Sequence, residues 1–471
     1  MAGAGYHRVI VRDALSLALV ALIVRVSWLW VHPSYMVADP DAYGEIARTL
    51  ADTGVYGVRY GAIEPSITAF RPPLYPWLIS WFVNSEGLDV TGVAWMHLVM
   101  GVVTALGVWS LVLHYHGQRS VAWLAGGLVV VDPLLLNQSS QLMTETLAAF
   151  LVVAIWWTYV MYHRVVDRST PPDKEASQAR GQEVAVEAST GERTRSARAW
   201  IALSALLGCL LTLAYLCRPT FLVWSLMLIA GDLFLARRNR RARRVGGVIA
   251  LSMVMLGVTA WTLRNQHVLQ RPVWATTHGG YTLLLGNNDW FYDHLVDRPW
   301  LWPWHRRSWQ PEAFFAAYQE RVVDSIAGEC RQDDASKEWA METIKRRPMT
   351  AIWASLQRVI RLWNPFPASV PGRSKSLVLG VGLFYCCKSL AVAACLFRYR
   401  RCLLSAWWWT TLSLAITLTT VHSLYWSNPR MRAPIAPMTA AVAALAFGAH
   451  ARRDVRVDSV QEPAPTTGAC D

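Results

Sequence analysis

Charged residues are scarce in this 471-residue chain. They make up 16% of it, while 54% of the residues are hydrophobic and the mean hydropathy is +0.24. Soluble domains carry about 25% charged residues, and long uncharged apolar runs are typical of transmembrane helices. The composition therefore excludes an ordinary soluble domain and favours an integral membrane protein.

The sequence also lacks the patterns of several other protein classes. The polar segment 264–375 holds a single cysteine, Cys330, and no pair of CxxC motifs occurs, which excludes a disulfide framework there and a structural zinc site. The glycine-rich stretches do not have the spacing of a phosphate loop, which disfavours a nucleotide-driven pump. The formal net charge of +13 comes from short arginine clusters between apolar runs, so a nucleic-acid partner is excluded as well.

Apolar runs of membrane-spanning length recur along the chain. The first, Ala14 to Val31, ends with Trp28 and Trp30 and is followed by His32 rather than by a small-residue cleavage site, and we expect an uncleaved first helix. With the later runs, each near the roughly 20 residues that a bilayer needs, the sequence predicts an all-α polytopic membrane protein of about ten transmembrane helices. The later runs are 93–113, 121–136, 141–161, 199–216, 219–235, 245–263, 376–397, 403–421 and 433–448.

Basic residues indicate the orientation of these spans. Clusters such as RRNRRARR (237–244) and RYRR (398–401) fall in alternate connections, which the positive-inside rule assigns to the cytoplasm. We therefore expect a multi-pass protein of the cytoplasmic membrane with both termini inside. The loops 32–92 and 264–375 would then face outside.

The same pattern predicts the domain organisation. Residues 1–263 would form a transmembrane core that carries the first external loop (32–92), with interfacial helices, and a disordered cytoplasmic linker (163–198), because this linker has almost no large apolar side chains. A small, mainly helical external subdomain (264–375), the C-terminal transmembrane helices (376–448) and a cytoplasmic tail (449–471) would follow.

The first external loop concentrates acidic residues. Asp39-Pro40-Asp41 has the form of a helix start, with Asp39 as N-cap and proline at the first helical position, and Gly54 ends the apolar periodicity that follows. A capping role is enough to explain Asp39. The helix dipole in the first turn can explain Asp41, and a solvent-exposed helix face can explain Glu45 and Asp52. The spacing of these acids alone therefore does not show that they are catalytic. Arg71, before Pro72 and Pro73, suits either a bound phosphate or the lipid headgroup level.

Isolated charges also mark the ends of several spans. They could converge on an outward-facing site for an anionic lipid phosphate, or they could simply anchor the spans. Arg25, inside the first span, either snorkels outward or pairs with an acid. The residues at the span ends are Asp132, Glu145, Arg218, Arg430 and Arg432, and Lys388 lies mid-span.

A set of short motifs occurs in a fixed order along about 440 residues of the chain. The motifs are Asp39-x-x-x-Tyr43 with Glu45-Ile46-Ala47, Arg71-Pro72-Pro73-Leu74-Tyr75-Pro76, Glu145, Arg218-Pro219, Gly286-Asn287 and Arg432-x-Pro434-Ile435-x-Pro437. Taken in this order, they resemble the GT-C superfamily of polytopic glycosyltransferases, within it the family of bacterial protein O-mannosyltransferases and the lipid A aminoarabinose transferase.

The resemblance implies sugar transfer, with inversion, from a polyprenyl-phosphate-linked donor to a lipid, glycan or protein acceptor at the outer face of the membrane. It implies that Asp39, with Asp41, acts on the acceptor. It further implies a substrate-binding set made of Tyr43, Arg71, Glu145, Arg218, Asn287, Arg430 and Arg432.

The sequence departs from the family pattern at two positions. Pro40 replaces the second acid of the family, so that Asp39 and Asp41 could share its role, and Arg71 replaces a lysine. Some relatives use a divalent metal and others none, and two aspartates leave this open. A transporter or lipid flippase, which would place acids at mid-bilayer, and a non-catalytic scaffold for envelope assembly are the alternatives.

Overall fold

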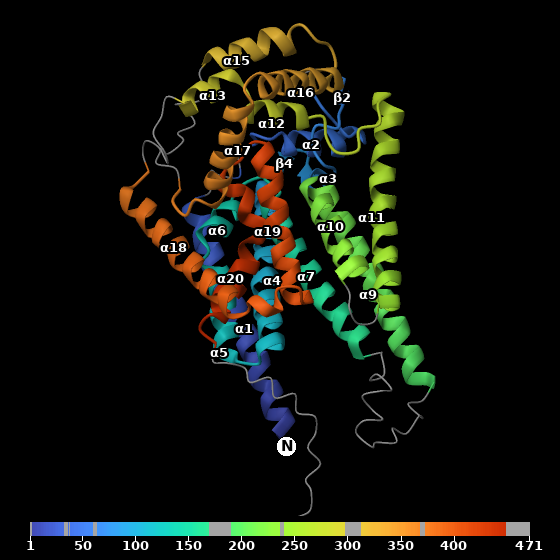
Figure 1. The fold of residues 1–471 in the computed structure, drawn as a ribbon, viewed down its shortest axis with the longest axis vertical. Helices are drawn as coiled ribbons and strands as arrows, with labels where there is room; N and C mark the ends of the chain where they lie inside the picture. Colours follow the sequence, from blue (N-terminus) through green and yellow to red (C-terminus); the bar gives the residue numbers. More distant parts are fainter. Residues whose placement is uncertain are drawn as a thin grey trace, which may run out of the picture.

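The computed structural model describes residues 2–32, 36, 38–59, 64–168, 190–235, 240–296, 312–367 and 373–448. Long helices lie side by side in a bundle, and short helices gather at one end, which we call the upper end (Figure 1). The first helix, α1 (Ala2–Val31), starts at the opposite end. The described residues hold only two small hairpins besides helices, which confirms the all-α fold class.

Six helices of the described chain are long and apolar enough to cross a membrane. A bent pair, α5 (Arg119–Val130) and α6 (Pro133–Ser139), makes a seventh if it counts as one span. The three other predicted spans are also helical but shorter or less apolar: α10 (Thr220–Ala230), α19 (Ala406–Leu424) and α20 (Ala436–Leu445). The six are α1, α4 (Val90–His116), α7 (Glu145–Arg168), α9 (Thr190–Cys217), α11 (Arg240–Leu269) and α18 (Lys375–Arg398).

The predicted span 121–136 is not one continuous helix. It bends by 48° between α5 and α6. Pro133 opens α6, and the side chain of Asp132 accepts hydrogen bonds from the backbone N–H groups of Leu134 and Leu135. Proline cannot continue the preceding hydrogen-bond ladder, and the aspartate starts a new helix there.

Arg25 of α1 does not snorkel. Its side chain is buried, with the residue only 2% exposed, and lies against Gly101 of α4, where any side chain would overlap the guanidinium. The snorkel interpretation is therefore wrong.

The described part of the first loop contains two short α-helices, α2 (Tyr43–Thr53) and α3 (Leu74–Ser80). The hairpin β1 (Gly57–Val58) with β2 (Ser66–Ile67) lies between them, and β3 (Val83–Asn84) with β4 (Gly87–Leu88) follows. The predicted start of α2 is wrong by three residues. The chain turns at residues 39–42, and Ala42, in the left-handed region (φ 59°), is the N-cap.

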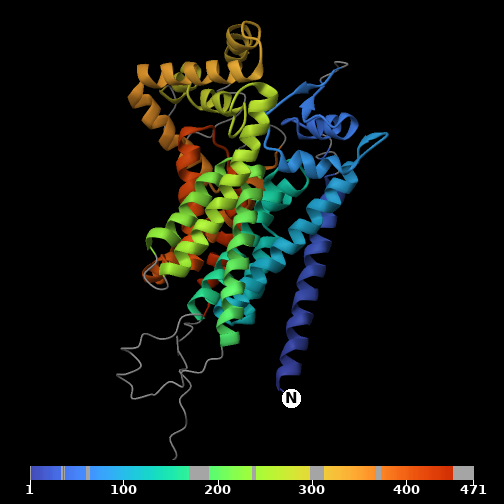
Figure 2. The ribbon, with the colours of Figure 1, turned by 90° about the vertical axis from the view of Figure 1, so that its right-hand side faces the viewer.

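Among the described residues, five helices and a π-helical turn form the other part of the upper end. They are α12 (Gly279–Gly286), α13 (Asp289–Val296), α15 (Glu312–Tyr318), η3 (Gln319–Val323), α16 (Glu329–Arg346) and α17 (Pro348–Trp363). They share a hydrophobic core of their own, built around Leu284, Phe291 and Phe314. Figure 2 shows this group and the first-loop elements next to each other at the same end.

The ends of the predicted linker 163–198 are helical, because α7 continues to Arg168 and α9 begins at Thr190. The rest of that linker and the tail 449–471 lie outside the described residues.

Candidate active site

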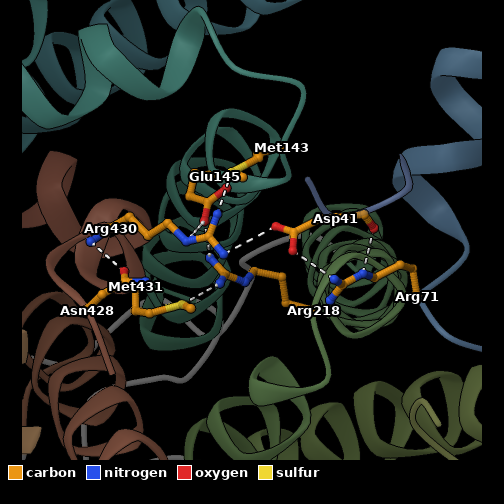
Figure 3. A network of polar contacts seen from close by, with 8 residues as sticks. All are labelled: Asp41, Arg71, Met143, Glu145, Arg218, Asn428, Arg430 and Met431. Carbon is orange, nitrogen blue, oxygen red and sulfur yellow. Dashed lines mark hydrogen bonds and ion pairs between the residues drawn. The ribbon is translucent and has the colours of Figure 1, made fainter. Parts of the chain in front are cut away.

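Five charged side chains from four distant parts of the chain meet at the upper end (Figure 3). We call them the acid–arginine cluster: Asp41, Arg71, Glu145, Arg218 and Arg430. Three guanidinium groups face two carboxylates, which leaves one positive charge in excess. The sequence predicted all five as site residues, and the structure brings them together.

Asp41 joins the two sides of the cluster. Its Oδ1 lies 2.7 Å from Nη2 of Arg71, and its Oδ2 lies 3.2 Å from Nη2 of Arg430. Arg71 also donates from Nε to the backbone carbonyl of Asp41 at 2.8 Å. Burial raises the pKa of Asp41, but the charges of Arg71 and Arg430 outweigh it and hold this pKa below its ordinary value.

Glu145 is buried without close partners. Its Oε1 lies 3.7 Å from Nη1 of Arg218 and 3.8 Å from Nε of Arg430, too far for direct hydrogen bonds. Among the described residues, no group hydrogen-bonds to its Oε2, to Nη1 of Arg218 or to Nε of Arg430. The cluster thus has two arginine N–H groups, on Arg218 and Arg430, that no described residue uses as hydrogen-bond donors.

The local fold explains why these charges meet. Glu145 is the first residue of α7, where the helix dipole favours a negative charge, and Arg218 follows the last residue of α9, where it favours a positive one. Arg430 lies in the 3₁₀ helix η5 (Pro429–Ile435), which the side chain of Asn428 caps. The thioethers of Met143 and Met431 contact Arg430 and Arg218, respectively.

Asp39 has a different environment from Asp41. Its Oδ2 accepts the backbone N–H of Glu45 at 3.0 Å, so it caps α2 from outside the helix. Within the described chain no donor reaches its Oδ1. Burial raises the pKa of Asp39 above its ordinary value, although N–H groups at the start of α2 oppose the shift. Asp39 therefore has one buried carboxylate oxygen to which no described residue donates a hydrogen bond, whereas both oxygens of Asp41 are paired.

Two rings pack around the Asp41–Arg71 pair. The guanidinium of Arg71 lies 5.4 Å from the ring centre of Tyr43 and 4.3 Å from that of Phe70. His278 stacks edge-on against Phe70, with 4.6 Å between ring centres. Burial, helped by Arg71, lowers the pKa of His278 to about 3, so its imidazole is neutral at physiological pH. Sequence reasoning missed His278, because no motif connects residue 278 with residues 41–71.

Two predicted site residues lie elsewhere. Arg432 donates to the carbonyls of Leu362 and Asn364 at the end of α17, at 3.2 and 2.7 Å. Asn287 is buried and donates to the carbonyls of Leu283 and Leu424, which ties α12 to the end of α19. Both side chains hold helices together at the upper end.

Glu329, the first residue of α16, holds the segment that connects β2 to Arg71. Its carboxylate accepts the hydroxyl of Thr68 at 2.5 Å and the backbone N–H of Ala69 at 2.7 Å. Arg264 donates to the carbonyl of Thr68 at 2.8 Å from the other side. Residues 68 and 69 are thus fixed two to three positions before Arg71.

The cluster does not fit a divalent metal. Such ions need several oxygen ligands within about 2.6 Å. Both carboxylate oxygens of Asp41 are already paired with guanidinium groups, those of Arg71 and Arg430. Within the described residues, no three His, Cys, Asp or Glu side chains lie close enough together to hold a metal ion.

The chain matches no protein-family model, and no curated protein sequence matches it. Among solved structures it is similar to the archaeal oligosaccharyltransferase AglB from Archaeoglobus fulgidus, in complex with an inhibitory peptide and a dolichol-phosphate, with a TM-score of 0.51 and 15% identity. The match covers 92% of this chain and 50% of that one, so this chain spans about half the length of that protein. The apo form of the same enzyme matches with a TM-score of 0.50 and 15% identity, over 91% of this chain and 50% of that one.

ArnT from Cupriavidus metallidurans, bound to undecaprenyl phosphate, was also found, with a TM-score of 0.36 and 14% identity, over 94% of this chain and 78% of that one. At such low sequence identities, structural similarity shows a shared fold only. The evidence for that fold is the match to AglB, because its TM-score is above 0.5. The chain therefore has a polytopic, largely helical fold similar to that of AglB.

Proposed function

We propose that this protein transfers a sugar, with inversion, from a polyprenyl-phosphate-linked donor to a lipid, glycan or protein acceptor at the outer face of the cytoplasmic membrane. The observation that carries the proposal is the acid–arginine cluster, with one positive charge in excess and unpaired N–H groups on Arg218 and Arg430. Guanidinium groups bind phosphate oxygens with paired hydrogen bonds. The similar structure of AglB is a complex with a dolichol-phosphate, which supports a polyprenyl-phosphate ligand for this protein.

In this proposal the reaction is a displacement at the anomeric carbon. The acceptor oxygen forms a bond to that carbon while the bond to the phosphate oxygen breaks, and the acceptor proton passes to the free Oδ1 of Asp39. The leaving phosphate gains one negative charge, which the excess positive charge of the cluster stabilises where it develops. Asp41 fixes Arg71 and Arg430 in place rather than taking the proton.

The test is transfer by purified protein in lipid nanodiscs, from a panel of labelled polyprenyl-phosphate sugars. We expect Asp39→Asn to lower the transfer rate by about 10²–10⁴-fold, the usual contribution of a general base. Asp52→Asn is the matched control, because Asp52 lies exposed near the end of α2, the helix whose start Asp39 caps. Full transfer by Asp39→Asn would remove Asp39 from catalysis, and no transfer from any donor by the wild type would contradict the proposed function.

A further inference from the structure

Arg430 bridges two carboxylates that come from distant parts of the chain. Its Nη2 lies 3.2 Å from Oδ2 of Asp41, in the first loop, and its Nε lies 3.8 Å from Oε1 of Glu145, at the start of α7. Figure 3 shows the guanidinium between the two acids, with Arg218 beside it. The side chain of Glu145 is only 3% exposed, so water gives it little help.

A cation between these acids is an electrostatic requirement. Two carboxylates that approach each other at a buried place repel, and a positive charge between them removes the repulsion. Burial lowers the pKa of Arg430, but Glu145 and Asp41 more than offset this, and the pKa lies above its ordinary value. Arg430 therefore remains charged at every working pH.

A divalent metal ion bound between the two carboxylates would also remove their repulsion. Here the guanidinium already occupies the space between them, and Arg218 adds a second positive charge 3.7 Å from Glu145. A metal ion in direct contact with Asp41 and Glu145 would meet like-charge repulsion from both arginines. Its entry would require Arg430 to leave.

We propose that Arg430 takes the place of a divalent cation between Asp41 and Glu145, so that the site keeps its shape and works without a metal. The second half of this inference rests on the proposed function, whereas the first half concerns metal binding alone. The probe is Mn²⁺, titrated into the full-length protein in nanodiscs and followed by the EPR signal of free Mn²⁺ and by thermal unfolding.

We expect no Mn²⁺ binding to the wild type and no change in its unfolding temperature with EDTA. Arg430→Gln uncovers the two acids and should bind Mn²⁺ with a rise in unfolding temperature, and the added change Asp41→Asn should abolish that gain. Arg432→Gln is the matched control. It removes a buried arginine two residues away that contacts carbonyls, and it should gain no binding.

Arg430→Lys keeps the charge and should remain unresponsive to Mn²⁺. The inference is overturned if the wild type binds one Mn²⁺ that Asp41→Asn removes, if folded Arg430→Gln gains no binding, or if Arg430→Lys binds as strongly as Arg430→Gln. Should Arg430→Gln not fold, the wild-type titration alone decides. EDTA-sensitive transfer by the wild type would overturn this inference only, whereas failure of transfer with every donor would overturn the proposed function only.

Discussion

Asp39 and Asp41 are two residues apart and differ in what surrounds their carboxylates. The sequence left open which one acts on the acceptor, because both follow the first span and both suit a helix start. The structure separates them through contacts that sequence spacing does not encode, since the partners of Asp41 lie 30 and 389 residues away. Asp41 is held by two arginines, whereas Asp39 keeps a free oxygen and a raised pKa.

This difference predicts a pH dependence. A general base works only when deprotonated, so transfer should fall as pH drops through the pKa of Asp39, which burial raises above 3.8. We expect kcat/KM to fall on the acidic side of its pH profile at a pH above the ordinary pKa range of aspartate. Arg48, half-exposed on α2, lowers the pKa of Asp39, so Arg48→Gln should move this fall to higher pH. A fall that stays at the same pH in Arg48→Gln would speak against Asp39 as the titrating group.

At the level of elements, the sequence predicted what depends on local chemistry. Hydropathy placed a helix in every predicted span, and Gly54 ends α2 in the left-handed conformation (φ 72°), as expected for a C-cap glycine. It did not predict the break at Asp132-Pro133 or the late start of α2, because proline and aspartate signal a helix start without fixing its register. The position of α16 against the first loop was also not predictable, since it depends on Glu329, 261 residues from Thr68.

The α16 contact yields a prediction for a positioning residue. Glu329→Ala leaves the buried N–H of Ala69 without an acceptor, and we expect the loop to loosen and the KM for the donor to rise by about tenfold, which corresponds to ~1.4 kcal/mol. Because the effect passes through Arg71, kcat should change less. Steady-state transfer kinetics at varied donor concentration measure both.

Glu329→Gln should retain most of the wild-type KM, because its amide can accept from Ala69 and donate to the hydroxyl of Thr68. Glu338→Ala, exposed on the same helix, is the control for surface charge. Equal effects of Glu329→Ala and Glu338→Ala on KM would mean that α16 acts by charge and does not position the loop.

At the scale of the whole molecule, one buried ion pair holds the bent span against the C-terminal helices. Nζ of Lys388, in α18, lies 2.8 Å from Oδ2 of Asp132 and donates to the carbonyl of Ala436 at 3.1 Å. The hydroxyl of Tyr385 donates to Oδ1 of Asp132 at 2.7 Å. Charges at this depth are expensive unless paired, and a transporter would use such a pair to carry charge. Here each partner is satisfied by fixed neighbours, which favours a structural role.

A structural pair and a functional pair predict different outcomes for the same variants. Lys388→Met leaves Asp132 buried without a cation and should cost about 3–5 kcal/mol, measured by thermal unfolding in nanodiscs. Adding Asp132→Asn removes the uncompensated charge but keeps an acceptor at the start of α6, so the double variant should recover most of the stability. It should also retain transfer activity, because neither residue touches the acid–arginine cluster in the described structure. A double variant that is stable but inactive would instead give this pair a part in moving charge or substrate through the bundle.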